Sequence, residues 1–320
     1  MCTVISDVKK LHLFARTLDL EYSFDEQVVI VPRGFELEFL REKIISNFAI
    51  IGTCHIESGT PLFYDGMNEY GLCMATLNFP SFAYYSNAKN GFINIASFEL
   101  IPFILRQCKD CQGALSLLKR INITNDSFSE KLLHTPMHWI IADKTSCFVL
   151  EPSENGLEIF ENPYRVLTNA PRFNFHSQNL CNYMGLNSTN PSNTLDSLVD
   201  LKAYSRGLGA FSLPGDFSSS SRFIRAVFCK SHTGIYNDEI CRMFNVLNTV
   251  FVPYGSVKTD TDMSVFTVYS CVMCADTGNY YFSTYENKRV CCVRLHDVNL
   301  NANSLFIYDM NFENEVKYLN

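Results

Sequence analysis

The sequence predicts a layered α+β fold in a single domain, and three observations lead to it. Short apolar runs typical of strands fill both ends of the chain. Two segments with apolar residues at helical spacing, 97–108 and 111–120, lie between them. No repeat, low-complexity tract or linker divides the 320 residues. Sheets covered by helices would bury these apolar faces, so we expect one domain over residues 1–320.

The first half of the chain predicts a sheet that begins almost at the N-terminus. Val4-Ile5 and Leu11 to Phe14 are apolar runs separated by polar residues, which indicates a hairpin. Two buried strands should follow, over 27–32 and 48–53. We interpret 65–72 as a turn inside a strand pair that leads into 74–80. The helices 97–108 and 111–120 complete this half.

The second half predicts further strands and two more helices. The strands expected here are 137–143, 147–151, 157–160, 164–169, 265–273, 279–285, 290–294 and 305–310. A long surface connection rich in Asn and Ser covers 174–200, and its start, 174–183, can form a helix. Serines at 218–221 predict the start of a helix near Arg222, and another helix should span 238–250. His138, beside the only Trp, is interpreted as a buried or hydrogen-bonded histidine.

Composition excludes several classes of partner. Hydrophobic residues make up 47% of the chain and charged residues 18%, which suits a large core. The net charge of -7 and the lack of a basic block exclude a nucleic-acid partner. No apolar run approaches the roughly 18 residues of a membrane span, so no membrane partner is expected. The N-terminus lacks a basic region followed by an apolar one, which favours a cytoplasmic protein without a secretory signal.

The cysteines predict reduced thiols rather than disulfides or a metal site. There are 13, an odd number, scattered along the chain. Two C-x-x-C spacings occur, Cys108 to Cys111 and Cys271 to Cys274, and Cys291-Cys292 is a vicinal pair. The two C-x-x-C pairs lie about 160 residues apart, outside any compact Cys/His module of the kind that binds zinc. We therefore assign no metal.

Cys2 is the candidate nucleophile. Removal of Met1 would leave a thiol and a free α-amine on the same residue. An α-amine has a reference pKa of about 7.7–8.0, so near neutral pH it can take the thiol proton and no separate histidine is needed. The alternative is that a cysteine stands at position 2 by chance, and the rest of the chain has to decide between the two.

Four further residues stand where they could assist Cys2. Arg16 and Asp19 are the nearest charges on the second strand of the expected hairpin. An arginine stabilises a thiolate by charge, and a carboxylate orients an ammonium. Asn78 and Asn169 each end a strand just before a turn closed by proline, and both could donate to an oxyanion. The ordinary alternatives are a surface ion pair and asparagines that satisfy local turn backbone.

Several motifs, taken together over essentially the whole chain, resemble one known family. They are Met1-Cys2-Thr3, Arg16-Thr17-Leu18-Asp19, Asp65-Gly66-Met67-Asn68-Glu69, Leu77-Asn78-Phe79-Pro80, Leu167-Thr168-Asn169-Ala170-Pro171, Leu213-Pro214-Gly215-Asp216, Ser221-Arg222-Phe223 and Tyr285-Glu286-Asn287. The chain resembles the choloylglycine hydrolase family, the bacterial conjugated bile acid hydrolases and penicillin V acylases. The resemblance implies an N-terminal nucleophile hydrolase fold, two antiparallel sheets face to face with helices outside in four αββα layers, and a homotetramer.

The resemblance also implies roles for single residues. Cys2 is nucleophile and, through its amine, base; Asp19 holds the amine; Arg16 and Arg222 flank the thiol; Asn78 and Asn169 form the oxyanion site. The family often has Gly-Arg-Asn where this chain has Ala15-Arg16-Thr17, which puts the detailed shape beside Arg16 in doubt. No cofactor is implied. By the same resemblance, the walls of an apolar substrate pocket come from Leu18, Tyr64, Phe128 and Leu132, where the alternative is plain core packing.

Three functions remain open at this point. The first is a bile salt hydrolase that cleaves the amide between a steroid acyl group and glycine or taurine through a thioester. The second is a penicillin V acylase or another N-acyl amide hydrolase of the same fold; Asn78, where the acylases often carry Tyr, favours the first. The third is a non-catalytic steroid-binding relative, which would not need Cys2. Ser205-Arg206-Gly207 resembles the taurine-preferring form of a variable segment, so Arg206 is expected to contact the sulfonate, the alternative being a solvated loop charge.

Overall fold

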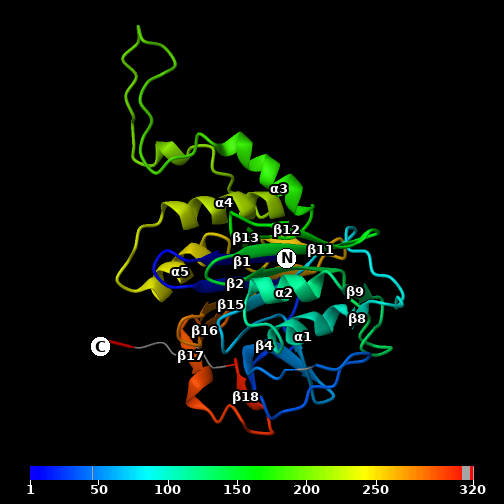
Figure 1. Cartoon of the computed structure of the whole chain (residues 1–320). Helices are drawn as coiled ribbons and strands as arrows, with labels where there is room; N and C mark the ends of the chain where they lie inside the picture. The colour runs from blue at the N-terminus through cyan, green and yellow to red at the C-terminus, as the bar shows by residue number, and fades with distance from the viewer. Residues whose placement is uncertain (45, 312–317, 320) are drawn as a thin grey trace.

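The structure is a computed structural model that describes residues 1–44, 46–311 and 318–319. Figure 1 shows two sheets stacked between helices, with one long loop standing away from the body. The element order along the chain agrees with the predicted mixture of strands at both ends and helices between.

The first sheet is built around the two N-terminal strands. Its strand order is β13-β1-β2-β15-β16-β17, with β14 paired to β15. The strands are β1 (Cys2–Asp7), β2 (Leu13–Leu20), β13 (Val166–Leu167), β14 (Val257–Lys258), β15 (Ser264–Cys274), β16 (Asn279–Thr284) and β17 (Cys291–Arg294). β1 and β2 form the expected antiparallel hairpin, in which Cys2 lies opposite Leu18. Residue 2 is therefore held inside a sheet with strands on both sides of β1.

The second sheet has the order β12-β11-β10-β7-β6-β4-β3-β18, with β5 paired to β4. Its strands are β3 (Gln27–Val31), β4 (Ile50–Glu57), β5 (Thr60–Phe63), β6 (Asp65–Asn68), β7 (Cys73–Asn78), β10 (Met137–Ala142), β11 (Cys147–Ser153), β12 (Gly156–Glu161) and β18 (Phe306–Asp309). A separate parallel pair joins β8 (Ile93–Ala96) to β9 (Ile121–Thr124).

The second sheet is buried on both faces, as the alternation of its side chains shows. In β3, Val28 and Ile30 belong to the core between the sheets, while Val29 and Val31 belong to a second core beneath the helices. Successive side chains of a strand point to opposite faces, so one strand supplies both cores. Apolar residues at every position of such a strand produce the continuous runs seen in the sequence.

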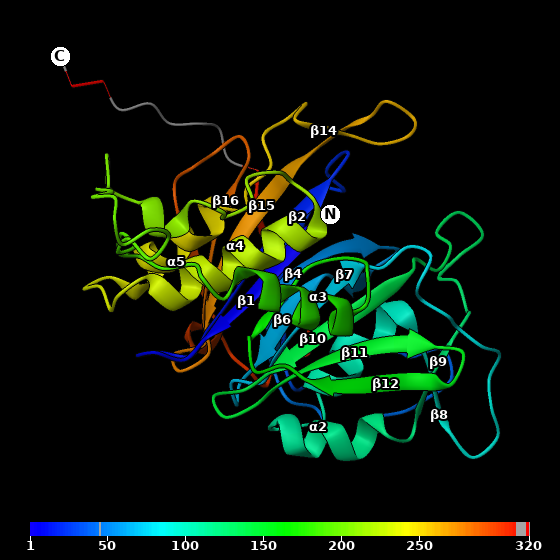
Figure 2. The same ribbon diagram turned by 90° about the horizontal axis from the view of Figure 1, so that it is seen from above.

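Helices cover the outer faces of both sheets, as Figure 2 shows from above. α1 (Leu100–Leu105) and α2 (Cys111–Leu118) lie on the second sheet, and α4 (Ser219–His232) and α5 (Glu239–Asn248) on the first. α3 (Phe173–Asn179) packs beside α4. Short 3₁₀ turns are η1 (Ser97–Glu99), η2 (Leu180–Tyr183), η3 (Leu208–Ala210) and η4 (Leu295–Asp297). The predicted stack of layers is confirmed.

Three expectations about individual elements need correction. The segment 65–72, interpreted as a turn, begins with strand β6, and the turn is confined to residues after Asn68. The helix expected over 97–108 starts as a 3₁₀ turn and ends at Leu105. Helix α4 begins at Ser219, three residues before Arg222, because Ser218 accepts a hydrogen bond from the main-chain N–H of Ser221 as its N-cap.

Candidate active site

Cys2 and Arg16 face each other between the two sheets. Cys2 is only 2% exposed, and its Sγ lies 3.1 Å from the donating Nη2 of Arg16 on the neighbouring strand. The other terminal nitrogen, Nη1, donates to the main-chain oxygen of Tyr64 at 2.7 Å. Because Nη1 is anchored on the second sheet, Nη2 is left to point at the sulfur. A guanidinium in this position stabilises a thiolate by charge and by hydrogen bonding.

The charge on Arg16 is balanced by Asp65 at the start of β6. Oδ2 of Asp65 lies 3.6 Å from Nη1 of Arg16. Burial opposes the charged form of Arg16, yet Tyr269, Cys2 and Asp65 raise its pKa above the ordinary value. Burial raises the pKa of Asp65 because it disfavours the charged carboxylate, whereas the charge of Arg16 lowers that pKa. The guanidinium therefore stays charged, with its nearest carboxylate on the far side from the sulfur.

Asp65 is held by hydrogen bonds from three strands. The hydroxyls of Tyr269 and Tyr280 donate to its two oxygens at 2.5 and 2.7 Å, and the N–H of Thr53 donates at 3.3 Å. Gly52 lets β4 come this close, because a Cβ there would lie 2.0 Å from the main-chain oxygen of Asp65. Four donors or charges around one buried carboxylate fix its place under Arg16.

Asn169 joins the N-terminus to the rest of the site. Its Oδ1 accepts from the main-chain N–H of Cys2 at 2.7 Å and from Nη2 of Arg222 at 2.8 Å. Its Nδ2 donates to the main-chain oxygen of Asn78 at 2.8 Å. The amide of Asn169 thus lies between residue 2 on the first sheet and the end of β7 on the second. The predicted pair Asn78 and Asn169 is brought together.

Arg222 differs in detail from the expectation that it flanks the thiol. Its Nη1 donates to the main-chain oxygen of Cys2 at 2.5 Å and to Oγ1 of Thr3 at 2.7 Å. It is fully buried on the first turns of α4, where burial lowers its pKa. Arg222 therefore holds the main chain of residue 2 and the Asn169 side chain, while Arg16 is the arginine that contacts the sulfur.

Asp19 lies beside residue 1 and is fully buried. Its Oδ1 accepts from Oγ1 of Thr267 at 2.7 Å, and its Oδ2 from Oγ1 of Thr17 at 3.3 Å. Its main chain exchanges two hydrogen bonds with Met1: Asp19 N–H to the Met1 oxygen at 2.9 Å, and the Met1 amine to the Asp19 oxygen at 2.5 Å. Thr17, the departure from the usual family pattern, supports the Asp19 carboxylate.

A cavity of about 270 Å³ opens beside Cys2. All four residues expected to form a substrate pocket line it, together with Cys2 and Asn78. The full lining is Cys2, Leu18, Leu20, Glu21, Tyr22, Phe24, His55, Leu62, Phe63, Tyr64, Thr76, Leu77, Asn78, Ser97, Phe98, Phe128, Leu132, Leu133, Thr135 and Met137. The lining is mostly apolar and comes from both sheets and the 128–135 loop, so the thiol faces a pocket suited to an apolar acyl group.

Comparison with known proteins places the chain in a family. The description "Linear amide C-N hydrolases, choloylglycine hydrolase family" matches residues 2–308. The chain belongs to the choloylglycine hydrolase family. It is therefore a hydrolase that acts on linear amide C–N bonds, and the resemblance seen in its motifs is confirmed.

Relatives within the choloylglycine hydrolase family align over nearly the whole chain. The bile salt hydrolase/transferase of Lactiplantibacillus plantarum is 39% identical over 318 residues, 98% of each chain. The conjugated bile acid hydrolase of Lactobacillus gasseri is 31% identical, over 96% of this chain and all of the other. The C2A mutant of the Clostridium perfringens conjugated bile acid hydrolase superposes with a TM-score of 0.92 at 34% identity, over 100% of both chains.

The fold expected of a choloylglycine hydrolase is confirmed as well. Penicillin V acylase from Agrobacterium tumefaciens shares it, with a TM-score of 0.77 at 18% identity over 97% of this chain and 91% of that one. The order of layers, with α1 and α2 outside one antiparallel sheet and α4 and α5 outside the other, is the αββα sandwich of N-terminal nucleophile hydrolases.

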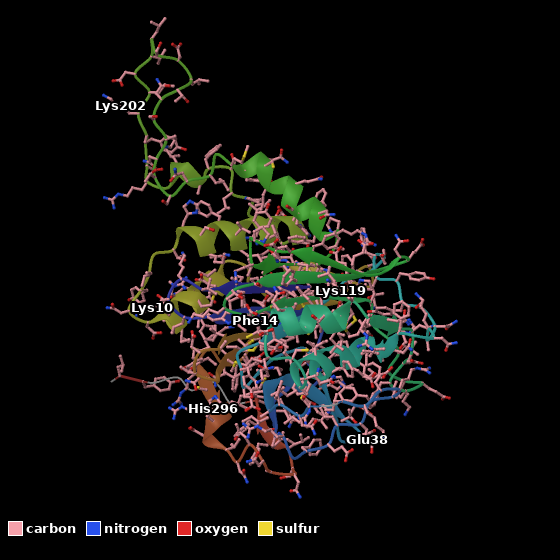
Figure 3. The ribbon with its side chains drawn as sticks, in the orientation of Figure 1. Lys10, Phe14, Glu38, Lys119, Lys202 and His296 are labelled. Carbon is pink, nitrogen blue, oxygen red and sulfur yellow. The ribbon has the colours of Figure 1, made fainter. Side chains whose placement is uncertain are left out.

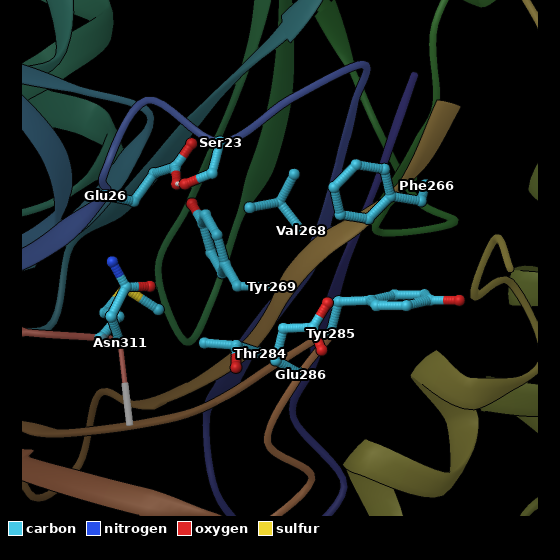
Figure 4. A pocket seen from close by; sticks show the side chains of 10 residues that line it. Ser23, Glu26, Phe266, Val268, Tyr269, Thr284, Tyr285, Glu286 and Asn311 are labelled. Carbon is cyan, nitrogen blue, oxygen red and sulfur yellow. Dashed lines mark hydrogen bonds between the residues drawn. The ribbon is translucent and has the colours of Figure 1, made fainter. Parts of the chain in front are cut away.

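A second cavity, of about 410 Å³, lies apart from the thiol of this choloylglycine hydrolase (Figure 4). Tyr269 lines it from β15, Tyr285 and Glu286 from the bend after β16, and Ser23 and Glu26 from the loop between β2 and β3. Ser23 donates to Glu26 across this wall. The same loop presents Tyr22 and Phe24 to the Cys2 cavity. One short loop therefore separates the two cavities, and only the smaller one contains the candidate nucleophile.

Arg206, which the sequence predicts to contact substrate, lies away from the Cys2 cavity of its own chain. It is exposed, on the loop that extends away from both sheets, and does not line the Cys2 cavity. Figure 3 shows Lys202 partway along the same loop. Contact between Arg206 and the amino-acid end of a substrate would require this loop to cover the mouth of the cavity.

The structure also bears on disulfides, metal binding and membrane spanning. All 13 cysteines are free thiols. Within residues 1–44, 46–311 and 318–319, no group of three or more His, Cys, Asp and Glu side chains is arranged to hold a metal ion. In the same part of the chain, each helix is too short or too polar to cross a bilayer.

Sequence reasoning missed several residues of the site. Asp65 lay within a quoted motif, but its place behind Arg16 depends on the meeting of β6 with β15 and β16. The aromatic side chains Tyr22 and Phe24 line the cavity from a loop and Phe98 from the 3₁₀ turn η1, none of them within a periodic pattern. One signal for the cavity wall was available. Tyr22 and Phe24 follow β2, the strand that carries Arg16 and Asp19, so they could be expected near the site.

Proposed function

We propose that this choloylglycine hydrolase is a bile salt hydrolase, which cleaves the amide bond between a steroid acyl group and glycine or taurine. The observation that carries the proposal is the position of Cys2 Sγ, 3.1 Å from Nη2 of Arg16 and at the wall of the apolar cavity. The names of two relatives that align over nearly the whole chain support the same substrate class: the one at 39% identity is described as a bile salt hydrolase/transferase and the one at 31% as a conjugated bile acid hydrolase.

The nucleophile in this proposal is the Cys2 thiolate, and its base is the α-amine freed by removal of Met1. With Met1 in place, the main-chain N–H of Cys2 donates to Asn169 Oδ1 at 2.7 Å. Loss of Met1 also frees the main-chain oxygen and N–H of Asp19 that now bind residue 1. The new amine thus lies between an amide oxygen and Asp19, where it can take the thiol proton. Arg16 stabilises the resulting thiolate.

The reaction follows as two acyl-transfer steps. The thiolate forms a bond to the amide carbonyl carbon, and the negative charge moves to the carbonyl oxygen. The C–N bond then breaks while the α-ammonium of Cys2 returns its proton to the leaving nitrogen, which departs as glycine or taurine. Water, deprotonated by the same amine, attacks the thioester and releases the bile acid and the thiolate. Atoms and charges balance without a metal or an organic cofactor.

Asn169 and the Asn78 region are proposed to hold the oxyanion. Nδ2 of Asn169 carries two protons, one of which is used by the main-chain oxygen of Asn78 at 2.8 Å. The other is available to a developing negative oxygen next to Cys2. Removal of one oxyanion donor typically costs about 100- to 1000-fold in rate. Arg222 keeps the Asn169 oxygen turned toward Cys2, which leaves the nitrogen for the substrate side.

The apolar cavity is proposed to receive the steroid. Leu18, Tyr64, Phe128 and Leu132 form its walls together with Phe98 and Met137. The Phe98–Phe128 pair, edge to face with 5.5 Å between ring centroids, defines one side. A flat, apolar acyl group lies against such rings with good contact and leaves its amide at the thiol.

The proposal extends to the leaving group and to the assembly. Arg206 is proposed to favour taurine conjugates, because a sulfonate offers three acceptor oxygens on a longer arm than the glycine carboxylate. We also propose a single domain over residues 1–320, loss of Met1 in the mature enzyme, a homotetramer and a cytoplasmic location in a bacterium. These proposals are supported by the family to which the chain belongs.

One assay tests the proposed function. Release of the amino acid from taurocholate and glycocholate, and of the amine from penicillin V, would be followed for the wild type, Cys2→Ala, Cys2→Ser and Cys241→Ala. Cys241 is the control, since it is exposed on α5. We expect release from both bile salts to disappear only in the Cys2 variants. Faster turnover of penicillin V than of either bile salt would favour an acylase, and hydrolysis by Cys2→Ala would overturn the mechanism.

A further inference from the structure

Two buried histidines hold the main chain at Thr168 and Asn169. Nε2 of His138 lies 2.8 Å from the oxygen of Thr168, and Nε2 of His176 lies 3.0 Å from the oxygen of Asn169. A carbonyl oxygen only accepts, so Nε2 must carry the proton in both rings. Both imidazoles are at most 1% exposed, and burial lowers both pKa values, which favours the neutral form. Two consecutive carbonyls are thus each fixed by an imidazole.

Each imidazole also stacks on a phenylalanine next to a proposed site residue. His138 lies on Phe79 with 4.1 Å between ring centroids and a 6° angle between the planes, and Phe79 follows Asn78. His176 lies on Phe223 with 4.9 Å between centroids and 21° between planes, and Phe223 follows Arg222. The two rings therefore connect the main chain at Thr168 and Asn169 to the end of β7 on one side and to α4 on the other.

The hydrogen bonds of Asn169 reach the same two neighbours. Its Nδ2 donates to the Asn78 oxygen, and its Oδ1 accepts from Arg222. The backbone of Asn169 is held against β7 and α4 by the histidines, and its side chain is held there by Asn78 and Arg222. The side-chain amide of Asn169 is thus fixed both by its own hydrogen bonds and by those of the main chain that carries it.

A buried carboxylate lies near the second nitrogen of the His138 ring. Nδ1 of His138 lies 3.6 Å from Oε1 of Glu151, and neither side chain is exposed. The same Oε1 accepts from the main-chain N–H of Phe173 at 2.8 Å. His138 is therefore held by the hydrogen bond from its Nε2 to the Thr168 carbonyl and by the stacking of its flat face on Phe79, while Glu151 on β11 lies near Nδ1 but beyond hydrogen-bond distance.

We propose that His138 and His176 are positioning residues that aim the Asn169 amide at the oxyanion. The inference rests on the proposed function, in which Asn169 contacts the developing negative charge. Both imidazoles are buried, and the Nε2 of each is directed at a main-chain oxygen, so the proposed role is contact with the main chain and not with substrate. They act through the 168–169 main chain. A displacement of about 1 Å at a reacting group can cost about 100-fold in rate, and the two rings remove the freedom for such a displacement.

Substitutions to Phe and Gln separate the hydrogen bond from the packing. A Phe keeps the stacked ring and loses the donor, while a Gln offers an amide nitrogen near the place of Nε2 and loses the ring. Because the contact is made in the transition state, kcat should fall and KM should stay within about twofold. We expect His138→Phe to lower kcat about 100-fold and His138→Gln to recover at least tenfold of that loss.

His176 gives a graded second test. The Asn169 oxygen also accepts from Oγ of Ser219 at 2.9 Å, so it keeps one donor in His176→Phe. The loss of kcat there should be smaller than in His138→Phe and should increase when Ser219→Ala is added. Thermal unfolding of every variant identifies those that fail to fold. If His138→Phe does not fold, the comparison of His176→Phe with His176→Gln and with the Ser219→Ala double variant decides.

A double-mutant cycle shows whether the histidines act through Asn169. In an Asn169→Ala background, His176→Phe should cause no further loss of kcat, because the amide that it positions is gone. Multiplied losses, unchanged kcat in the Phe variants, or Gln variants no better than Phe variants would overturn the inference. Activity in Cys2→Ala is the separate sign that the proposed function is wrong, so the two failures are distinguishable.

Discussion

Oδ2 of Asp65 lies 3.6 Å from Nη1 of Arg16, and neither side chain has any solvent exposure. Breaking a buried ion pair from one side leaves an uncompensated charge and typically costs about 3–5 kcal/mol. We predict a loss of that size in the free energy of unfolding for both Asp65→Asn and Arg16→Leu, measured by urea denaturation at pH 7.

The double variant gives the sharper result for this pair. When both charges are removed, no buried charge remains, so Arg16→Leu with Asp65→Asn should lose clearly less than the sum of the single losses. The exposed pair between Lys144 and Asp276 is the control; Lys144→Ala should cost less than about 1 kcal/mol. Losses that simply add would mean that Asp65 does not serve as the counter-charge of Arg16.

An N-terminal extension should abolish activity and leave the fold intact. With any residue before Cys2, its nitrogen is an amide, as it is now in the bond to Asn169 Oδ1, and an amide cannot act as the base. The measurement is release of taurine from taurocholate by protein with an uncleavable N-terminal tag. The same tag at the C-terminus is the control. Mass spectrometry should find Met1 missing from all active material; full activity with Met1 in place would refute the proposal.

Arg206→Gly tests the proposed taurine preference. We expect the wild type to hydrolyse taurocholate with a higher kcat/KM than glycocholate, by roughly fivefold, the equivalent of about 1 kcal/mol for an exposed charge contact. The variant should narrow this difference, mainly by slowing the taurine substrate. Lys202→Gly, on the same exposed loop, is the matched control. Equal slowing of both conjugates would identify Arg206 as an ordinary solvated charge.

Stability should fall as pH drops from about 6.5 to about 4, and His12 should contribute part of that loss. Burial, followed by the charge of Arg165, lowers the pKa of His12 from 6.5 to about 4. In that window the unfolded chain binds a proton that the folded chain does not, so the contribution is complete above pH 6.5 and is lost as the pH decreases. The shift corresponds to about 3 kcal/mol.

The matched variant for this pH effect is His12→Gln. Its free energy of unfolding, measured in urea at pH 7 and at pH 4, should depend on pH by about 3 kcal/mol less than that of the wild type. The N–H of His12 bonds to Asp276 through the main chain and is kept in the variant. Curves of stability against pH that run parallel for the two proteins would show that another group is responsible.

Local sequence patterns were sufficient where one strand or helix decides the outcome. The β1–β2 hairpin and the α4 cap at Ser218 follow from alternation and from helix-start chemistry. The residues of β6 predict a turn because Gly66 and Asn68 are poor strand formers. A side chain at Gly66 would meet the Ile51 oxygen at 3.0 Å, so glycine there serves a close approach between strands. Such a requirement exists only in the assembled sheet.

The reactive residues themselves could be named from motifs, but their contacts could not. Nothing local to Asn169 indicates that its oxygen would bind Cys2 or that two histidines would hold the main chain there. Cys2 and His138 come from strands distant in the sequence, and His176, only seven residues on, reaches back only once α3 has formed. The cavity shows the same limit. Phe128 and Leu132 were expected from the resemblance, whereas Tyr22 and Phe24 enter through a loop whose path depends on both sheets.

The bond from Arg222 to the Cys2 carbonyl spans 220 positions of the chain. A ribosome that adds roughly 5–20 residues per second makes the two residues about 10–45 seconds apart. During that interval β1 lacks its α4 partner, and the thiol is accessible to oxidants and to electrophiles. Contacts of such long sequence separation also slow folding itself. Exposure to peroxide during synthesis should therefore damage this protein far more than the same dose given to the finished enzyme.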